Sequence, residues 1–211
     1  MESSNTEKNQ TVIASILGPQ GTNPNTKAKI LSAYLKVTVE EGSTELSLTK
    51  LAEEAGVSKQ LVRYYIPNLN EAALELFKIM IQIAAGITQK EIEAAKTPED
   101  QIAAWANATF DWLKSYPDFA QFVLFMYQRA SVDDKVNELY SEHLQMGRKR
   151  ILTVLKKFKK KKIQDNAAFY AKTLHQQMTA TLVEMLALKD IAHQNKYRKD
   201  FFTFMDFLLK A

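Results

Sequence analysis

The sequence contains no cysteine, little glycine and proline, and no long apolar run. The absence of cysteine excludes disulfides and thiolate chemistry, and it fits a reducing compartment. The 6 glycines and 5 prolines leave few breaks for helices in a chain of 211 residues. No stretch approaches the roughly 20 apolar residues that span a bilayer, and the acidic start lacks the basic region of a signal peptide. We therefore expect a soluble, cytoplasmic protein with no membrane partner.

The sequence also lacks a large excess of either positive or negative charge. The formal net charge is +4, and residues 26–70 contain six basic and five acidic side chains, a balance of +1. This balance excludes a surface that binds nucleic acid through bulk positive charge. Any contact with DNA must therefore come from individually positioned groups.

Helical periodicity fills the chain beyond residue 25, with no strand alternation and no internal repeat. The sequence therefore predicts an all-α fold. Residues 1–25 are polar and contain glycine and proline, so they predict a flexible N-terminal arm. Helices are expected over residues 26–41, 47–55, 59–65, 70–95, 98–115, 117–130, 132–160, 165–188 and 196–210.

Residues 47–65 have the pattern of a helix-turn-helix. Ser47 and Ser58 suit helix N-caps, and Gly56 suits the left-handed turn that most residues resist. The second helix of such a pair reads the major groove with its N-terminal side chains. Here that helix, "KQLVRYY" at 59–65, interleaves long polar side chains with aromatic ones. Considered alone, these residues fit a solvated face of a helical hairpin equally well.

The longer segment 26–74 resembles the N-terminal DNA-binding region of TetR-type transcriptional regulators. The residues that match the family pattern in one register are Ile30, Leu31, Ala33, Gly42, Ser47, Leu48, Leu51, Ala52, Ala55, Gly56, Val57 and Ser58. Arg63, Ile66 and Leu69 depart from it. They stand where the family usually has tyrosine, phenylalanine and a lysine that contacts phosphate.

The resemblance implies a DNA interface on the first three predicted helices. Its expected residues are Thr26, Ser47, Thr49, Ser58, Lys59, Gln60, Leu61, Arg63, Tyr64 and Tyr65. Those at 59, 60, 61 and 63 are expected to contact bases, because glutamine pairs with adenine and lysine or arginine with guanine. Hydroxyl groups at 26, 47, 49, 64 and 65 are expected to contact phosphates. With Leu69 in place of lysine, that phosphate contact is expected to be lost or moved to backbone N–H groups beside Asn68 and Asn70.

The resemblance also implies a three-helix DNA-binding domain at 26–69 and a six-helix domain for effector binding and dimerisation at 70–211. Aromatic and apolar stripes on the central helices predict a pocket for a small apolar or aromatic effector. Simple core packing is the commoner role for any single one of these side chains. The candidate pocket residues are Trp105, Thr109, Trp112, Phe122, Met126, His143, Arg150 and His175.

The last two predicted helices are too apolar for a solvent-facing terminus. In TetR-type regulators the corresponding helices pair two chains across a two-fold axis, which implies a homodimer and a near-palindromic operator in double-stranded DNA. The residues expected at this interface are Ala167, Ala171, Leu174, Met178, Thr181, Leu182, Met185, Phe201, Phe202, Met205 and Leu208.

We find no motif for catalysis, a cofactor or a metal. Three histidines without cysteine or a paired spacing do not predict a metal site, and no phosphate loop or nucleophile elbow is present. The lysine run "KKFKKKK" at 156–162 is interpreted as a solvated helix end.

We therefore expect a regulator that binds specific DNA sequences, a repressor released from its operator by a small-molecule effector, and not an enzyme. The alternative is a helical ligand-binding or scaffolding dimer whose DNA-reading head is vestigial.

Overall fold

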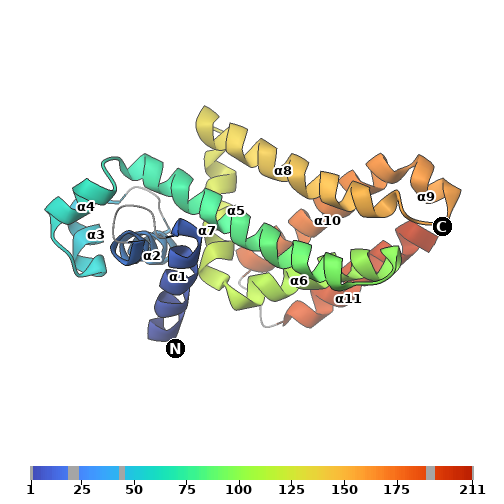
Figure 1. Ribbon diagram of the computed structural model, residues 1–211, viewed down its shortest axis with the longest axis horizontal. Coiled ribbons are helices and arrows are strands. Elements are labelled where there is room, and N and C mark those ends of the chain that lie inside the picture. The colour runs from blue at the N-terminus through green and yellow to red at the C-terminus, as the bar shows by residue number, and fades with distance from the viewer. Residues whose placement is uncertain (1, 19–23, 43–45, 189–192, 211) are drawn as a thin grey trace. The chain divides into compact units, whose positions relative to one another are not determined.

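The computed structural model describes residues 2–18, 24–42, 46–188 and 193–210. Within these ranges every regular element is a helix, which confirms the all-α prediction (Figure 1). The helices are α1 (Glu2–Leu17), α2 (Pro24–Glu41), α3 (Leu48–Ala55), α4 (Lys59–Tyr65), α5 (Leu69–Ala94), α6 (Pro98–Ser115), α7 (Pro117–Arg129), α8 (Asp134–Leu155), α9 (Lys161–Asp165), α10 (Ala167–Ala187) and α11 (Gln194–Lys210).

The chain divides into two compact units. Unit 1 comprises Met1–Ile83 and Tyr116–Glu138, and unit 2 comprises Ala84–Ser115 and Leu139–Ala211. The predicted division at residue 69 is a division by function, and it stays a prediction.

Local sequence signals explain where several helices begin. Pro98 and Pro117 each start a helix, because proline's fixed φ suits the first turn and its missing N–H costs nothing there. Thr97 and Asp100 form a capping arrangement. The Asp100 backbone N–H donates to Thr97 Oγ1 at 3.1 Å, and the Thr97 hydroxyl donates to the Asp100 carboxylate at 2.7 Å.

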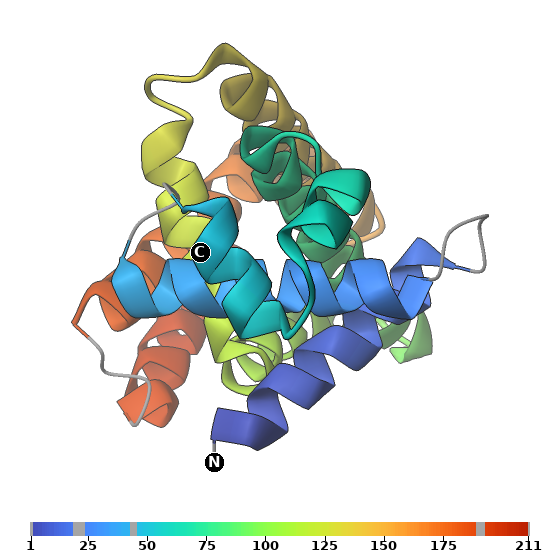
Figure 2. The same ribbon diagram turned by 90° about the vertical axis from the view of Figure 1, so that its left-hand side faces the viewer.

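The predicted flexible N-terminal arm is wrong for most of its length, because residues Glu2–Leu17 form α1. This helix packs against α2 in unit 1 (Figure 2). Ile13 is fully buried, the Ser32 hydroxyl donates to the Thr6 carbonyl at 3.1 Å, and Asn9 Nδ2 donates to Asp118 at the start of α7 at 2.8 Å. These contacts hold α1 on the same unit as the predicted reading helix.

The core of unit 1 forms where α2 packs against α1, α3 and α7. Tyr34 on α2 lies edge-on to Phe122 on α7, with ring centroids 6.4 Å apart, and both side chains are fully buried. Burial raises the pKa of the Tyr34 hydroxyl to about 12.

In unit 2, Phe201 of α11 packs against two aromatic rings of α6, Trp105 and Phe110, each with centroids 6.0 Å away. Gln194 Nε2 donates to the Phe110 carbonyl, and Arg198 pairs with Asp111. These contacts join α6 and α11 through both apolar and polar groups.

The lysine run interrupts the helix that we expected over 132–160. Helix α8 ends at Leu155, and the short α9 lies between it and α10. Phe158 within the run is buried, and Gln164 Nε2 donates to its carbonyl at 2.6 Å. The lysines themselves are exposed, so the break arises because one aromatic side chain turns inward while its basic neighbours stay in solvent.

Candidate nucleic-acid interface and ligand groove

The predicted helix-turn-helix has the expected local geometry. Ser47 caps α3 by accepting from the Lys50 backbone N–H at 3.1 Å, and Ser58 caps α4 by accepting from the Leu61 N–H at 3.2 Å. Between them, Gly56 has a φ of +57° in the left-handed region. The turn and both caps therefore fix how α4 leaves α3.

Helix α4 buries one face and exposes the other. Val62 is fully buried and Ile66, just after the helix, is 2% exposed. The exposed side chains are Lys59, Gln60, Arg63 and Tyr64, whereas Leu61 and Tyr65 are half-buried. Tyr64 is 67% exposed even though its ring lies edge-on to that of Tyr65, with centroids 5.1 Å apart. The predicted DNA-binding domain at 26–69 is called the head below. Figure 2 shows its helices α3 and α4 on the side that faces the viewer.

Among the described residues of the head, the two cations of α4 have no ion-pair partner. Three other lysines of the head each contact a carboxylate: Lys27 contacts Glu75, Lys36 contacts Glu54, and Lys50 contacts Glu41. Neither Lys59 nor Arg63 forms an ion pair with any residue that the structure describes. Although the head is nearly neutral, two of its three cations without an ion pair among the described residues, Lys59 and Arg63, lie on the predicted reading helix, and the third is the exposed Lys29 of α2.

The remaining predicted DNA contacts are less uniform. Ser47 is exposed, whereas Thr26 and Thr49 are half-buried. The Asn70 N–H already donates to Asn68 Oδ1 at 2.9 Å, so it is not free to replace the lysine that Leu69 displaces. The Asn68 side chain thus caps α5, and the expected rerouting to other backbone N–H groups there stays a prediction.

The predicted pocket residues divide between the two units. Phe122 and Met126 are fully buried in unit 1. In unit 2, Trp105 and Trp112 are buried, and the half-buried Thr109 donates its hydroxyl to the Trp105 carbonyl at 2.9 Å. Trp112 Nε1 has no hydrogen-bond partner among the described residues. No structural observation gathers all eight residues at one cavity, so their common role stays a prediction.

The predicted polar residues His143, Arg150 and His175 influence one another in unit 2. Burial lowers the pKa of His143 to about 4, with a smaller effect from the positive charge of Arg150. Burial likewise lowers the pKa of His175 to about 4, aided by His143, Arg148 and Arg150. His175 packs against Gly147 of α8, and its Nδ1 has no hydrogen-bond partner among the described residues.

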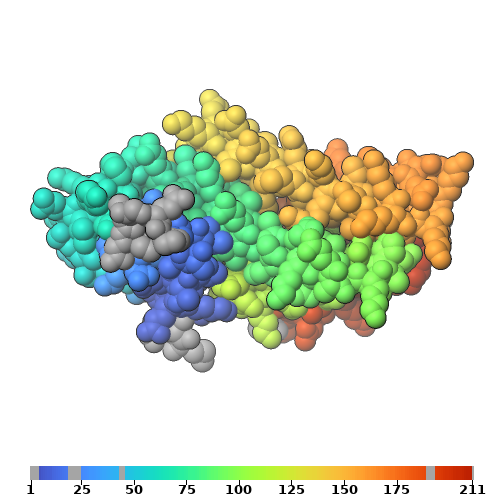
Figure 3. Space-filling model, in the orientation of Figure 1, coloured from blue at the N-terminus to red at the C-terminus, as the bar shows by residue number. Residues whose placement is uncertain are grey.

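A groove of about 520 Å³ lies in unit 2 beside Arg150. Its lining residues are Gln89, Ile92, Glu93, Gln101, Met146, Lys149, Arg150, Thr153, Val154 and Lys157. Figure 3 shows the furrow where the green surface of α5 and α6 meets the yellow and orange surface of α8. Sequence reasoning found only Arg150 of this set. The "RKR" run at 148–150 was the available signal, because it places several cations on one helical turn.

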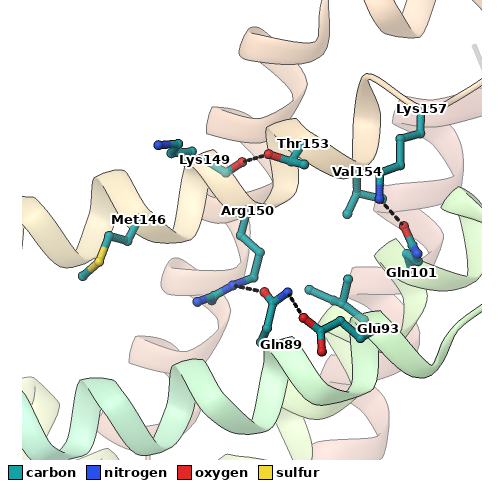
Figure 4. A pocket seen from close by; sticks show the side chains of 10 residues that line it. Gln89, Glu93, Gln101, Met146, Lys149, Arg150, Thr153, Val154 and Lys157 are labelled. Atoms are coloured by element: carbon teal, nitrogen blue, oxygen red, sulfur yellow. Dashed lines mark hydrogen bonds between the residues drawn. The ribbon is translucent and has the colours of Figure 1, made fainter.

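In Figure 4, Arg150 and Gln89 reach toward each other from α8 and α5. Arg150 Nε donates to Gln89 Oε1 at 3.1 Å, and its Nη1 donates to Thr88 Oγ1 at 3.2 Å. Gln89 Nε2 in turn donates to Glu93 at 2.7 Å. Lys157 Nζ donates to Gln101 Oε1 at 3.4 Å.

Most residues predicted for the dimer interface are buried within the single chain. These are Ala167, Ala171, Leu174, Met178, Thr181, Met185, Phe201 and Met205. Their burial shows that helices of the same chain already cover much of these side chains, and their place in a dimer interface stays a prediction. Leu182, Phe202 and Leu208 are half-buried. The large apolar side chains exposed on the last two helices include Phe169 and Phe207, at 62% and 74%.

Among the described residues, no group of three or more candidate side chains could hold a metal ion. None of the helices in that part of the chain combines the length and the apolar character needed to cross a membrane.

No family model matches the chain. In sequence, it is 23% identical over 119 residues to the helix-turn-helix transcriptional regulator BetI of Brucella suis, and the match covers 56% of this chain and 60% of that regulator. BetI of Rhizobium meliloti is 21% identical over 136 residues, covering 64% and 67%. The chain thus spans less than two thirds of the length of the Brucella relative that it matches.

The solved structures extend the likeness over most of the chain. A TetR transcription regulator from Haloarcula marismortui covers 87% of this chain and 98% of its own, with a TM-score of 0.76 and 16% identity. A transcriptional regulator from Saccharomonospora viridis, solved in complex with choline, covers 86% and 97% with a TM-score of 0.72 and 14% identity. The resemblance predicted from residues 26–74 is therefore confirmed, and the chain has the fold of TetR-type transcriptional regulators.

Proposed function

We propose that this protein is a sequence-specific, DNA-binding transcriptional regulator, and specifically a repressor that a small-molecule effector releases from its operator. The observation that carries the proposal is the exposed face of α4. Lys59, Gln60 and Arg63 project from a helix that two serine caps and Gly56 hold in place, and the two cations lack carboxylate partners among the described residues.

The chemistry of that face suits a DNA groove. The N-terminal side chains of a reading helix contact base edges, and glutamine, lysine and arginine can discriminate between bases there. Tyr64 and Tyr65 offer hydroxyl donors for phosphate, which position the helix without reading sequence.

The effector part of the proposal rests on unit 2. The structural neighbour from Saccharomonospora viridis is in complex with choline, which supports a small molecule as the regulating signal in a chain of this fold. Effector binding would lower operator affinity only as far as the effector prefers the conformation that does not bind DNA.

We further propose that two copies act as a homodimer through α10 and α11. Phe169 and Phe207 are candidates for the surface that the second copy covers, because apolar side chains as exposed as these commonly mark an interface. The variant Phe169→Ser/Phe207→Ser should shift the molar mass measured by light scattering toward that of the monomer. Tyr127→Ser, at a side chain 51% exposed on α7, is the control and should leave the mass unchanged.

The direct test of DNA binding is fluorescence anisotropy with the promoter fragment beside the protein's own gene, compared with a shuffled fragment of equal length. We expect tighter binding to the promoter, and affinity for both fragments should fall as salt rises. Equal affinity for the two fragments at every salt concentration would reject sequence-specific regulation.

A helical ligand-binding or scaffolding dimer remains the second candidate, favoured by Leu69 where the family has a lysine. A ligand-binding dimer of that kind would bind small molecules normally and show no promoter preference. In it, Lys59→Ala/Gln60→Ala would leave the affinity for the promoter fragment unchanged. The regulator loses operator affinity on the same substitution.

A further inference from the structure

We propose that the groove lined by α5, α6 and α8 binds an amphiphilic organic anion, with Arg150 as the counter-ion of its carboxylate-like head group. As a binding site the groove stands on its own geometry; as the effector site it rests on the proposed regulatory function.

Among the described residues, the hydrogen-bond partners of the Arg150 guanidinium are neutral. Its guanidinium donates to the Gln89 amide oxygen and the Thr88 hydroxyl, and it forms no ion pair with a carboxylate among the described residues. Glu93 is linked to it only through Gln89. A guanidinium has five N–H donors, so two hydrogen bonds leave three that could bind a carboxylate in the bidentate geometry arginine favours.

The surroundings reinforce this preference. Arg150 is half-buried, and burial lowers its pKa, which means that its charge has lost part of its solvation. Lys149 and Lys157 also line the groove, so three cations face the single carboxylate of Glu93, a net charge of +2. An anion bound in the groove would compensate the net positive charge and the lost solvation of Arg150.

The same groove offers an apolar surface for the rest of the ligand. Ile92 and Val154 are buried at its wall, and Met146 is 50% exposed. A flexible thioether adapts to differently shaped apolar groups. The volume of about 520 Å³ lies within the range of small-molecule sites. A ligand with one anionic end and a compact apolar body therefore fits better than a bare inorganic ion.

The groove is unsuited to a quaternary ammonium ligand such as choline. None of its lining residues is aromatic, so no ring face is available for a cation–π contact. The net positive charge would repel a cation as well. The ligand chemistry of this groove thus differs from that of the choline-bound neighbour.

The test uses two fluorescent probes with the same aromatic body. One is 8-anilinonaphthalene-1-sulfonate, an organic anion, and the other is N-phenyl-1-naphthylamine, which lacks the sulfonate. The full-length protein is titrated with each probe, and octanoate or octyltrimethylammonium is then added as a competitor. We expect octanoate to displace the sulfonate probe and octyltrimethylammonium to leave it bound.

Arg150→Gln should weaken binding of the sulfonate probe at least about tenfold, the usual size of a lost charge-assisted pair, and change the neutral probe less than about twofold. Lys135→Gln, which removes an exposed cation from α8 outside the groove, is the matched control and should change neither probe. Equal losses for both probes, an unchanged Arg150→Gln variant, or equal displacement by the ammonium competitor would each overturn the proposal.

If circular dichroism shows that Arg150→Gln is unfolded, Lys149→Gln/Lys157→Gln replaces it, with an expected loss of about threefold for the sulfonate probe alone. An unchanged affinity in that variant counts against the site. Operator binding is measured separately on the same protein. Retained anion binding without promoter preference rejects the proposed function alone, and promoter binding without a selective anion site rejects the groove alone.

Discussion

Replacing Gly147 with alanine tests the packing of α8 against α10 most sharply. A Cβ at this position would lie 2.4 Å from Nε2 and 2.8 Å from Cδ2 of His175, well inside ordinary van der Waals contact. Overpacking of this kind costs about 1–3 kcal/mol, while alanine gains about 1 kcal/mol over glycine in helix propensity. We expect Gly147→Ala to lower the free energy of unfolding by about 1 kcal/mol.

The cause can be isolated with a double-mutant cycle measured by urea unfolding. In a His175→Ala background the obstructing ring is gone, so Gly147→Ala should become stabilising by about 1 kcal/mol. Gly86→Ala on α5 is the control, because a Cβ there meets nothing within 4 Å and should stabilise both backgrounds equally. The reasoning is refuted if Gly147→Ala has the same effect, within about 0.5 kcal/mol, with and without His175.

Three further predictions concern α1, the cap of α4 and the histidines. Ile13→Ala should cost about 2–4 kcal/mol in urea unfolding because the side chain is fully buried, whereas Ile16→Ala, at 39% exposed on the same helix, should cost under about 0.5 kcal/mol. Ser58→Ala should cost about 1 kcal/mol and speed amide hydrogen exchange in α4. The pKa values of His143 and His175, about 4 against an ordinary 6.5, mean that the folded state binds fewer protons than the unfolded state between these values. The contribution of the two histidines to stability should therefore be constant above pH 6.5 and fall from there toward pH 4, and replacing both histidines with glutamine should flatten the fall measured from pH 7 to 5.

The head was predictable because its signals are local. Ser47, Gly56 and Ser58 each determine a cap or a turn through their own backbone and side chain. The observed α3 begins and ends, and α4 begins, where these residues require. The pairing of charges was not predictable. Lys36 and Lys50 contact carboxylates, whereas Lys59 and Arg63 contact none among the described residues. This difference depends on how separate helices meet.

Helix α1 was missed because its sequence is polar, although the helix packs closely against α2. Its buried apolar side chain Ile13 and the hydrogen bonds of Asn9 and Ser32 help to hold it in place. The sequence has no strong apolar stripe that would predict this packing. The sequence alone could not decide which residues form the dimer interface, for a related reason. A helical apolar stripe such as Leu174 and Met178 indicates that a face must be covered, but a covering helix of the same chain and one of a second chain leave the same pattern.

The groove also lies beyond sequence reasoning. Gln89 and Arg150 are 61 residues apart, and their hydrogen bond exists only because α5 and α8 approach each other at these two residues. From the sequence alone, Lys149 and Lys157 cannot be distinguished from ordinary solvated lysines, because the sequence does not show the groove that they line.

The central claim is that α4 reads DNA, and the most direct measurement is the affinity for the protein's own promoter across a salt series. Wild type is compared with Lys59→Ala/Gln60→Ala and with Lys36→Ala, which removes a lysine that already pairs with Glu54. We predict that the double variant binds at least about 30-fold more weakly, from a loss of about 2 kcal/mol or more, with a shallower salt dependence. Lys36→Ala should stay within about threefold of wild type. Equal affinities for all three proteins would contradict the account.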